Sequence, residues 1–115
     1  PLGFSINEKS LRRAGMDYIK KSDYNLWPDL DTCLKKINYH SVYSISTKGK
    51  KIYSDLTYKK NDAFIFGPET TGLPQKIIDQ YDSIAIPMKS AGRSINLANA
   101  VSIIVYEAWR QLKFM

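Results

Sequence analysis

Apolar positions follow two spacings along this chain, one typical of strands and one typical of helices. Alternation over His40–Ile45 and short apolar runs over Ala63–Phe66 and Ser83–Ile86 predict three strands, each followed by turn-forming residues. Start signals and helical spacing predict helices that begin near four residues, Asn7, Pro28, Pro74 and Asn96. Because strands alternate with helices, the pattern predicts an α/β fold built on a mainly parallel sheet.

Two of the predicted helices have a well-defined apolar face. In the helix expected from Pro28, Cys33 lies on that face, so its thiol is expected in the core. Asn96 is a natural cap for the last helix, since its side chain can accept from free backbone N–H groups. The apolar stripe of that last helix consists of Leu97, Val101, Ile104, Ala108 and Leu112.

Length and composition limit the possible classes of protein. The chain has 115 residues, 43% of them hydrophobic, and no internal repeat or linker, so residues 1–115 are predicted to form a single domain. With one cysteine and one histidine, Cys33 and His40, no internal disulfide or Cys/His zinc cluster is expected. The longest apolar run, Ala100–Tyr106, is far shorter than the roughly 20 residues that cross a bilayer. No membrane segment, no metal and a cytoplasmic location are therefore predicted.

The charge balance favours an anionic partner. Seventeen Lys and Arg against eleven Asp and Glu give a net charge of +6 and a pI near 9.4, a balance that suits phosphate binding. Lysine and arginine clusters alternate with tyrosines that could stack on bases. Each cluster could equally be a solvated face that serves solubility. The clusters are Lys9/Arg12/Arg13, Lys20/Lys21, Lys48/Lys50/Lys51 and Lys59/Lys60.

A glycine-containing loop follows the strand predicted over Ala63–Phe66. Gly67 and Gly72 have the spacing of a phosphate-binding P-loop, but Leu73 and Pro74 stand where that motif needs Lys and Ser/Thr, which argues against a nucleotide triphosphatase. Gly67 would let a ligand approach the backbone, and Glu69 would put a carboxylate at the rim. An ordinary turn from strand to helix remains the alternative.

A second loop of small residues follows the next predicted strand. Arg93 lies just before the last helix, where an arginine and the helix N-terminus could together hold a phosphate. The alternative is that Ser94 and Asn96 are only caps and Arg93 only a solvated charge. Since loops after parallel strands meet at one edge of a sheet, this loop and the Gly67 loop are expected to share one pocket. His40 has no partner near it in sequence and is expected to be structural.

Seven segments occur in the order found in one known family. They are Pro1–Phe4, Leu11–Tyr18, Thr47–Gly49, Phe66–Pro74, Ile86–Met88, Arg93–Val101 and Val105–Leu112. In these segments the chain resembles the TrmL-type tRNA wobble-nucleotide ribose 2′-O-methyltransferases of the knotted SPOUT superfamily. The resemblance extends over essentially the whole chain.

The resemblance implies a fold, a cofactor and partners. The expected fold is a SPOUT-type trefoil-knotted α/β domain, with a mainly parallel sheet flanked by helices, in a homodimer. The expected cofactor is S-adenosylmethionine, with S-adenosylhomocysteine as product, and the expected substrate is the anticodon stem-loop of tRNA, methylated at a wobble cytidine or uridine. The residues implied at the cofactor are Ile45, Gly67, Ile86 and Ser94. Those implied at the reacting groups are Glu69, Ser94 and Asn96, and those implied at RNA are Arg12, Arg13, Arg93 and Tyr106.

Members of this family also carry a strand, a helix with an arginine, and a second strand before the position that Pro1 matches. The resemblance therefore implies that residues 1–115 are the C-terminal portion of the domain. That upstream arginine is commonly assigned a catalytic part, so residues 1–115 alone are expected to bind cofactor poorly. The alternative function is a noncatalytic RNA-binding module, or an inactive fragment, that keeps the knot.

Overall fold

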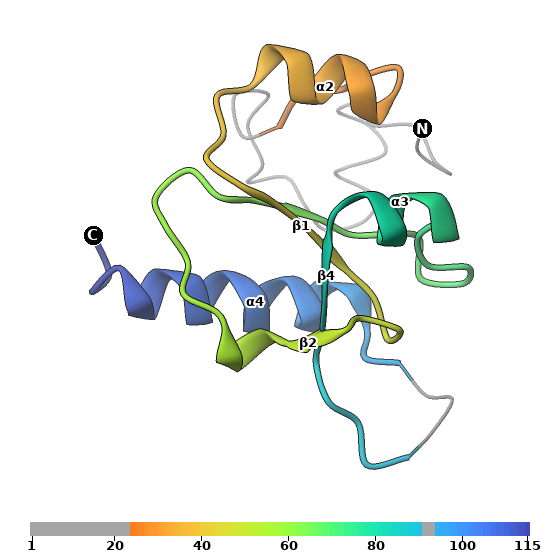
Figure 1. Cartoon of the computed structure of the whole chain (residues 1–115), viewed down its shortest axis with the longest axis vertical. Coiled ribbons are helices and arrows are strands. Elements are labelled where there is room, and N and C mark those ends of the chain that lie inside the picture. The colour runs from red at the N-terminus through yellow and green to blue at the C-terminus, as the bar shows by residue number, and fades with distance from the viewer. Residues whose placement is uncertain (1–23, 91–93) are drawn as a thin grey trace, which may run out of the picture. The chain divides into compact units, whose positions relative to one another are not determined.

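The computed structural model describes residues 24–90 and 94–115 (Figure 1). The chain divides into two compact units, residues 1–38 and residues 39–115. The single domain expected over residues 1–115 stays a prediction. The helix expected from Asn7 lies outside the described residues.

The described part of the first unit contains one helix, α2, over Leu30–Lys36. The helix was expected to start at Pro28 but begins at Leu30, because Asp29 is its cap and the Asp29 side chain accepts the Thr32 N–H at 2.7 Å. This hydrogen bond from the Thr32 backbone lowers the pKa of the Asp29 carboxyl. The expectation of a core thiol is wrong, since Cys33 is only partly buried and α2 has no buried residue.

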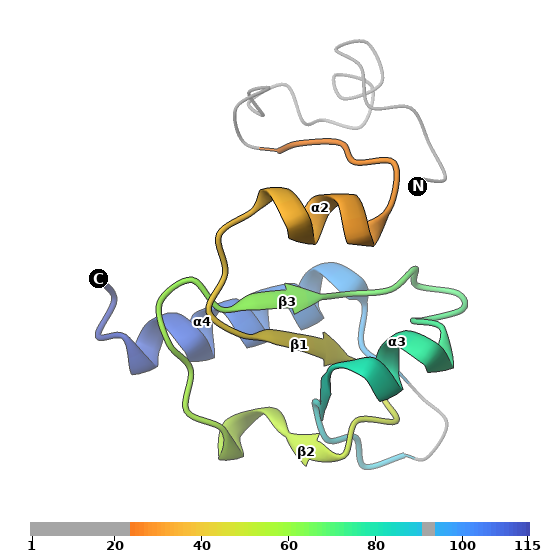
Figure 2. The ribbon, with the colours of Figure 1, turned by 45° about the horizontal axis from the view of Figure 1, so that its top comes forward.

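The second unit is built on a four-stranded sheet. Its strands are β1 (Val42–Ile45), β2 (Lys51–Ile52), β3 (Ala63–Ile65) and β4 (Asp82–Ala85), in the order β2-β4-β1-β3. Every pairing in this sheet is parallel, and Figure 2 shows β1 and β3 side by side and pointing the same way. The mainly parallel α/β fold is confirmed. Only β2 was not predicted, because two residues are too few to show an alternation.

One face of this sheet packs against the long helix α4, which spans Leu97–Gln111. The core consists of Tyr58, Ile84 and Ile104, with Tyr43 of β1 and Phe64 of β3 packed against it. The ring of Tyr58 meets the rings of Tyr43 and Phe64 edge-on, with centroids 5.6 and 5.4 Å away. Burial of these rings and of Ile104 on α4 contributes apolar contact that stabilises this unit.

The other face of the sheet carries small residues beneath the short helix α3 (Gln75–Gln80). Ser44 and Ser83 are buried there, and so is Ile78 of α3. The Ser44 hydroxyl donates to the Tyr81 carbonyl at 3.5 Å, and the Ser83 hydroxyl accepts the Lys50 N–H at 3.1 Å. Both serines therefore have hydrogen-bond partners in place of water, as buried polar groups require.

Candidate functional site

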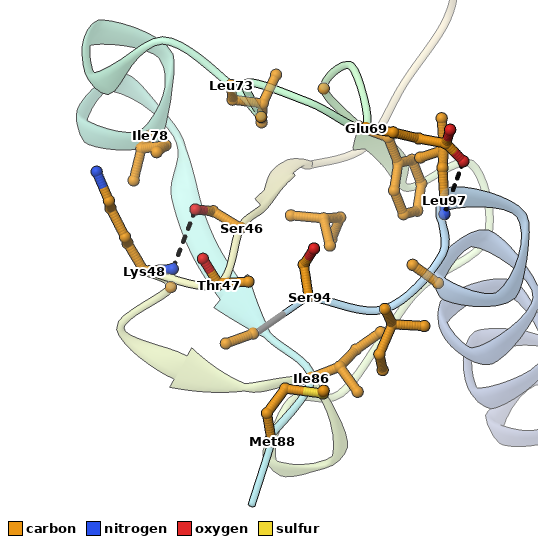
Figure 3. A pocket seen from close by; sticks show the side chains of 18 of the residues that line it. Ser46, Thr47, Lys48, Glu69, Leu73, Ile78, Ile86, Met88, Ser94 and Leu97 are labelled. Atoms are coloured by element: carbon orange, nitrogen blue, oxygen red, sulfur yellow. Dashed lines mark hydrogen bonds between the residues drawn. The ribbon is translucent and has the colours of Figure 1, made fainter. Parts of the chain in front are cut away.

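Three loops leave the sheet at the carboxyl ends of β1, β3 and β4, and they surround one cavity of about 780 Å³ (Figure 3). Because all strands are parallel, these three ends lie at the same edge of the sheet, which is where ligands bind in open α/β folds. Gly67 and Ser94, from different loops, both line this cavity. The prediction that the two loops share one pocket is confirmed.

The loop after β3 closes tightly on itself. The Gly72 N–H donates to the Pro68 carbonyl at 2.8 Å, and Gly72 has a φ of 68°, a conformation that favours glycine. A Cβ on Gly67 would collide with the backbone of Gly72 and Leu73. Gly67 is therefore required by the close approach of its own loop, a reason beyond the ligand access that the sequence suggested.

Two side chains organise the N-terminus of α4. Asn96 is its cap, and the Asn96 Oδ1 accepts the N–H groups of Ala98 at 2.9 Å and Asn99 at 3.4 Å. Glu69, from the loop after β3, accepts the Leu97 N–H at 3.3 Å (Figure 3). A carboxylate near these free N–H groups also complements the helix dipole. Glu69 thus ties the loop after β3 to the start of α4.

The structure brings together most of the residues expected at the cofactor and reacting groups. Five of them line the cavity: Ile45, Gly67, Glu69, Ile86 and Ser94. Asn96 is not among the lining residues, because its side chain is turned toward the α4 backbone. Their roles in binding and catalysis stay predictions.

Four residues were expected to contact RNA, and only one of them is described. Tyr106 lies on α4 outside the cavity lining, is 59% exposed, and meets Trp109 edge-on with ring centroids 5.6 Å apart. Its role at RNA stays a prediction. Arg12, Arg13 and Arg93 lie outside the described residues.

Sequence reasoning missed the loop after β1 as a wall of the cavity. Ser46, Thr47, Lys48 and Gly49 all line it, and so does Ile52 of β2. The position of this loop directly after a predicted strand was the available indication, because loops after parallel strands share one edge. No such indication existed for Ile52, because β2 was not predicted.

His40 is placed outside the cavity, as a structural role would require. Its Nδ1 lies 3.1 Å from Asp62 Oδ1 and 3.2 Å from Ser41 Oγ. Since the same ring nitrogen faces both groups, His40 cannot relay a proton between them as in a hydrolase triad. Within residues 24–90 and 94–115, no group of three His, Cys, Asp or Glu side chains could hold a metal ion, and no helix is long and apolar enough to span a membrane.

Comparison with known families and curated proteins identifies the relatives of this fold and site. The model of the SpoU rRNA Methylase family matches residues 1–106. A protein of Escherichia coli K12 named tRNA (cytidine(34)-2'-O)-methyltransferase is 43% identical, over 99% of this chain and 74% of its own length. This chain belongs to the SpoU methylase family. A second relative of the same name, from Methylovorus glucosotrophus, is 38% identical over 99% of this chain and 76% of its own length.

Solved structures agree with membership of this enzyme family. One that concerns the 2-OH methylation of C/U34 on tRNA has a TM-score of 0.88 and 34% identity, covering 100% of this SpoU methylase and 76% of that chain. The SpoU methyltransferase AviRb of Streptomyces viridochromogenes, in complex with the cofactor AdoMet, has a TM-score of 0.56 and 30% identity, covering 62% of this chain and 27% of that one. The α/β class is confirmed, and the knot stays an expectation of the resemblance.

Proposed function

We propose that this protein transfers a methyl group from S-adenosylmethionine to the ribose 2′-hydroxyl of the wobble nucleotide, cytidine or uridine, in the anticodon stem-loop of tRNA. Curated relatives named for this reaction match 99% of the chain, and this supports the choice of substrate. The observation that carries the proposal is the cavity at the carboxyl edge of the sheet, lined from separate loops by Gly67 and Ser94.

The lining of this cavity fits S-adenosylmethionine. A volume of about 780 Å³ lies in the range of roughly 300–1,000 Å³ found for small-molecule sites. Ile45 and Ile86 offer apolar walls for an adenine ring, Gly67 allows a close backbone approach, and Ser94 adds a hydroxyl. We propose these four residues as the cofactor contacts.

The reaction needs an aligned hydroxyl and an acceptor for its proton. When bound, S-adenosylmethionine supplies a methyl group on a positively charged sulfur and leaves as S-adenosylhomocysteine. The ribose oxygen forms the new bond to the methyl carbon, the carbon–sulfur bond breaks, and its electron pair stays on sulfur. The hydroxyl proton must go to a base in the site. We propose Glu69 as that base and Ser94 and Asn96 as residues that order the reacting groups.

Glu69 could instead act only as the tie between its loop and α4, and two substitutions separate these roles. Glu69→Gln keeps an oxygen that can accept the Leu97 N–H but cannot take a proton. If Glu69 is the base, Glu69→Gln should lower kcat by about 10²-fold or more and should retain S-adenosylhomocysteine affinity. Normal turnover in Glu69→Gln, with weakened cofactor binding in Glu69→Ala, would show that Glu69 only links the loop after β3 to α4.

Asn96 needs a matched control because its side chain caps α4. Asn96→Ala removes the acceptor for the Ala98 and Asn99 N–H groups, so a loss of methylation could come from the helix. Asn96→Ser retains a good capping side chain. We expect both variants to lose methylation if Asn96 orders the reacting groups, whereas full activity in Asn96→Ser would limit Asn96 to capping.

Mapping of transferred methyl on tRNA tests the proposed function directly. Tritiated S-adenosylmethionine should label the 2′-oxygen of nucleotide 34, and calorimetry should detect binding of S-adenosylhomocysteine. RNA binding without heat from S-adenosylhomocysteine would identify a noncatalytic RNA-binding module. Label at another nucleotide would overturn the proposed substrate.

The exposed side of α4 supports a proposed homodimer. Tyr106, Trp109 and Phe114 form a chain of edge-on rings, with Trp109 and Phe114 centroids 5.1 Å apart, and all three are exposed. Exposed aromatic groups of this kind mark contact surfaces. Sedimentation should show a dimer that Trp109→Glu weakens, and an unchanged dimer in that variant would exclude this face.

Two further assignments belong to the same proposal. RNA contacts are proposed at Arg12, Arg13, Arg93 and Tyr106, which the resemblance implies and the net charge of +6 favours. A cytoplasmic location is proposed because the substrate is tRNA. Loss of tRNA affinity in Arg93→Ala, with unchanged S-adenosylhomocysteine affinity, would support the RNA assignment.

A further inference from the structure

The loop after β1 is held firmly against β4. The Ser46 N–H donates to the Ile84 carbonyl at 3.0 Å, and the Gly49 N–H donates to the Ser46 carbonyl at 3.0 Å. Gly49 lies so close to the backbone of Ile84 and Ala85 that a Cβ there would collide with it. The Lys48 N–H donates to the Ser46 hydroxyl at 3.1 Å. The backbone that carries Lys48 is therefore fixed at the wall of the cavity.

Lys48 is the single cation among the described residues that line this cavity, and Glu69 is the single anion. Figure 3 shows them on opposite sides, with Ser94 between them. At 4.0 Å or less from nitrogen to oxygen, no ion pair of Lys48 is found in the described part of the chain. The ammonium group of Lys48 is thus free to meet a ligand, and the neighbouring residue Thr47 also lines the cavity.

We propose that Lys48, with the Thr47 hydroxyl, forms an oxyanion site at this side of the cavity, an inference that rests on the proposed methyl transfer. The reactants offer two oxyanions, the carboxylate on the amino-acid tail of the methyl donor and a phosphate next to the methylated ribose. A lysine ammonium, a compact point charge with three donors, suits either group. Its distance from Glu69 keeps the cation apart from the proposed proton acceptor.

Calorimetry with two ligands tests the carboxylate source. S-adenosylhomocysteine has the amino-acid tail, and 5′-methylthioadenosine lacks it. If Lys48 binds the carboxylate, Lys48→Met should weaken S-adenosylhomocysteine about tenfold and leave 5′-methylthioadenosine unchanged. Lys50→Met is the matched control, because Lys50 is an exposed lysine of the same segment that does not line the cavity.

Binding of the anticodon stem-loop at several salt concentrations tests the phosphate source. If Lys48 binds a phosphate, Lys48→Met should leave S-adenosylhomocysteine affinity unchanged and lower RNA affinity. The slope of log K against log salt should fall by about one, as expected when one phosphate contact is lost. Equal losses in Lys48→Met and Lys50→Met would indicate general attraction and would overturn the site.

The wild-type protein separates failure of this inference from failure of the proposed function. If it binds neither S-adenosylhomocysteine nor RNA, the proposed function fails. If it binds both and Lys48→Met matches it in each assay, the oxyanion site alone is refuted. Circular dichroism of both lysine variants should match the wild type, since neither side chain has an ion pair with another residue of the described ranges 24–90 and 94–115.

Discussion

The two edges of the sheet use their polar side chains in opposite ways. At the carboxyl edge, Lys48, Glu69 and Ser94 line an open cavity, and the ammonium of Lys48 has no ion-pair partner in the described part of the chain. At the amino edge, the side chains of Asp62 and Gln111 are occupied by contacts within the protein. The difference separates a surface available for chemistry from one that stabilises the fold.

Asp62 shows how complete these contacts are at the amino edge. Its carboxylate accepts the Ser41 N–H at 3.1 Å and the Lys59 N–H at 2.8 Å, and it lies 3.1 Å from the His40 ring. Its side chain is only 2% exposed. It therefore joins the starts of β1 and β3 through hydrogen bonds to backbone N–H groups.

Gln111, at the end of α4, makes a similar connection. Its Oε1 accepts the Tyr58 N–H at 2.8 Å, and its Nε2 donates to the Leu56 carbonyl at 2.9 Å. This pair of bonds satisfies the backbone of a segment that belongs to no strand. These two backbone groups are therefore already paired within the protein.

Tyr58→Ala should produce the largest change and the clearest separation of the two edges. The ring is buried against Tyr43 and Phe64, so its removal should lower the free energy of unfolding by about 3–5 kcal/mol. Urea denaturation measures this loss. At temperatures where the variant stays folded, its S-adenosylhomocysteine affinity should remain near that of the wild type, and a large loss would show that the edges are coupled.

Asp62→Ala should have the next largest effect, again on stability. It leaves the N–H groups of Ser41 and Lys59 without their acceptor, at a cost of about 1–3 kcal/mol each or less if water enters. His40→Ala is the control, because His40 is exposed and its loss leaves both N–H groups bonded. Equal destabilisation by the two substitutions, measured by thermal unfolding, would contradict this account.

Gly67→Ala tests the carboxyl edge. Its Cβ would collide with Gly72 and Leu73, so the loop after β3 must shift. We expect S-adenosylhomocysteine affinity to fall by about tenfold or more, which is about 1.4 kcal/mol, with a smaller change in unfolding than Tyr58→Ala gives. Lys76→Ala, at an exposed position on α3 that does not line the cavity, is the control. Unchanged affinity in Gly67→Ala would separate the loop from ligand binding.

A further loss of stability is expected in strong base. Burial, and secondarily the neighbouring Tyr43 and acidic groups, raises the pKa of Tyr58 from 10.0 to about 12. Because folding favours the neutral phenol, its contribution is complete below pH 10 and is lost as pH rises through about 12. Burial also raises the pKa of Tyr43, so phenolate absorbance should show more than one late titration. Tyr58→Phe should remove the step near pH 12, and a step near pH 12 that persists in this variant would contradict the assignment to Tyr58.

Acid should weaken the contact between Glu107 and Arg110 on α4, because the pKa of Glu107 is lowered whereas that of Tyr58 is raised. Hydrogen bonds from Arg110 and then Gln111 lower the pKa of Glu107 from 4.5 to about 2. This contribution is present above about pH 4.5 and is lost as pH falls through about 2. The Arg110 side chain is exposed to solvent, so Glu107→Gln should shift acid unfolding only slightly.

Strong local patterns anticipated most of the fold. β1, β3 and β4 were predicted because alternation or a short apolar run was followed each time by turn residues, and α4 was predicted from Asn96 and its apolar stripe. The two errors have different causes. β2 has only two residues, and the apolar face of α2 does not bury Cys33.

Ordered motifs along the chain were enough to indicate the family, and the identity of Gly67, Glu69 and Ser94 was enough to nominate a site, because these residue types limit backbone conformation and chemistry locally. The contacts of each side chain were not readable in this way. The folded chain alone shows that Lys48 belongs to the cavity, that Asn96 caps α4 away from it, and that Glu69 reaches the Leu97 N–H. Such contacts join residues far apart in sequence, and their geometry depends on how the strands and helices pack.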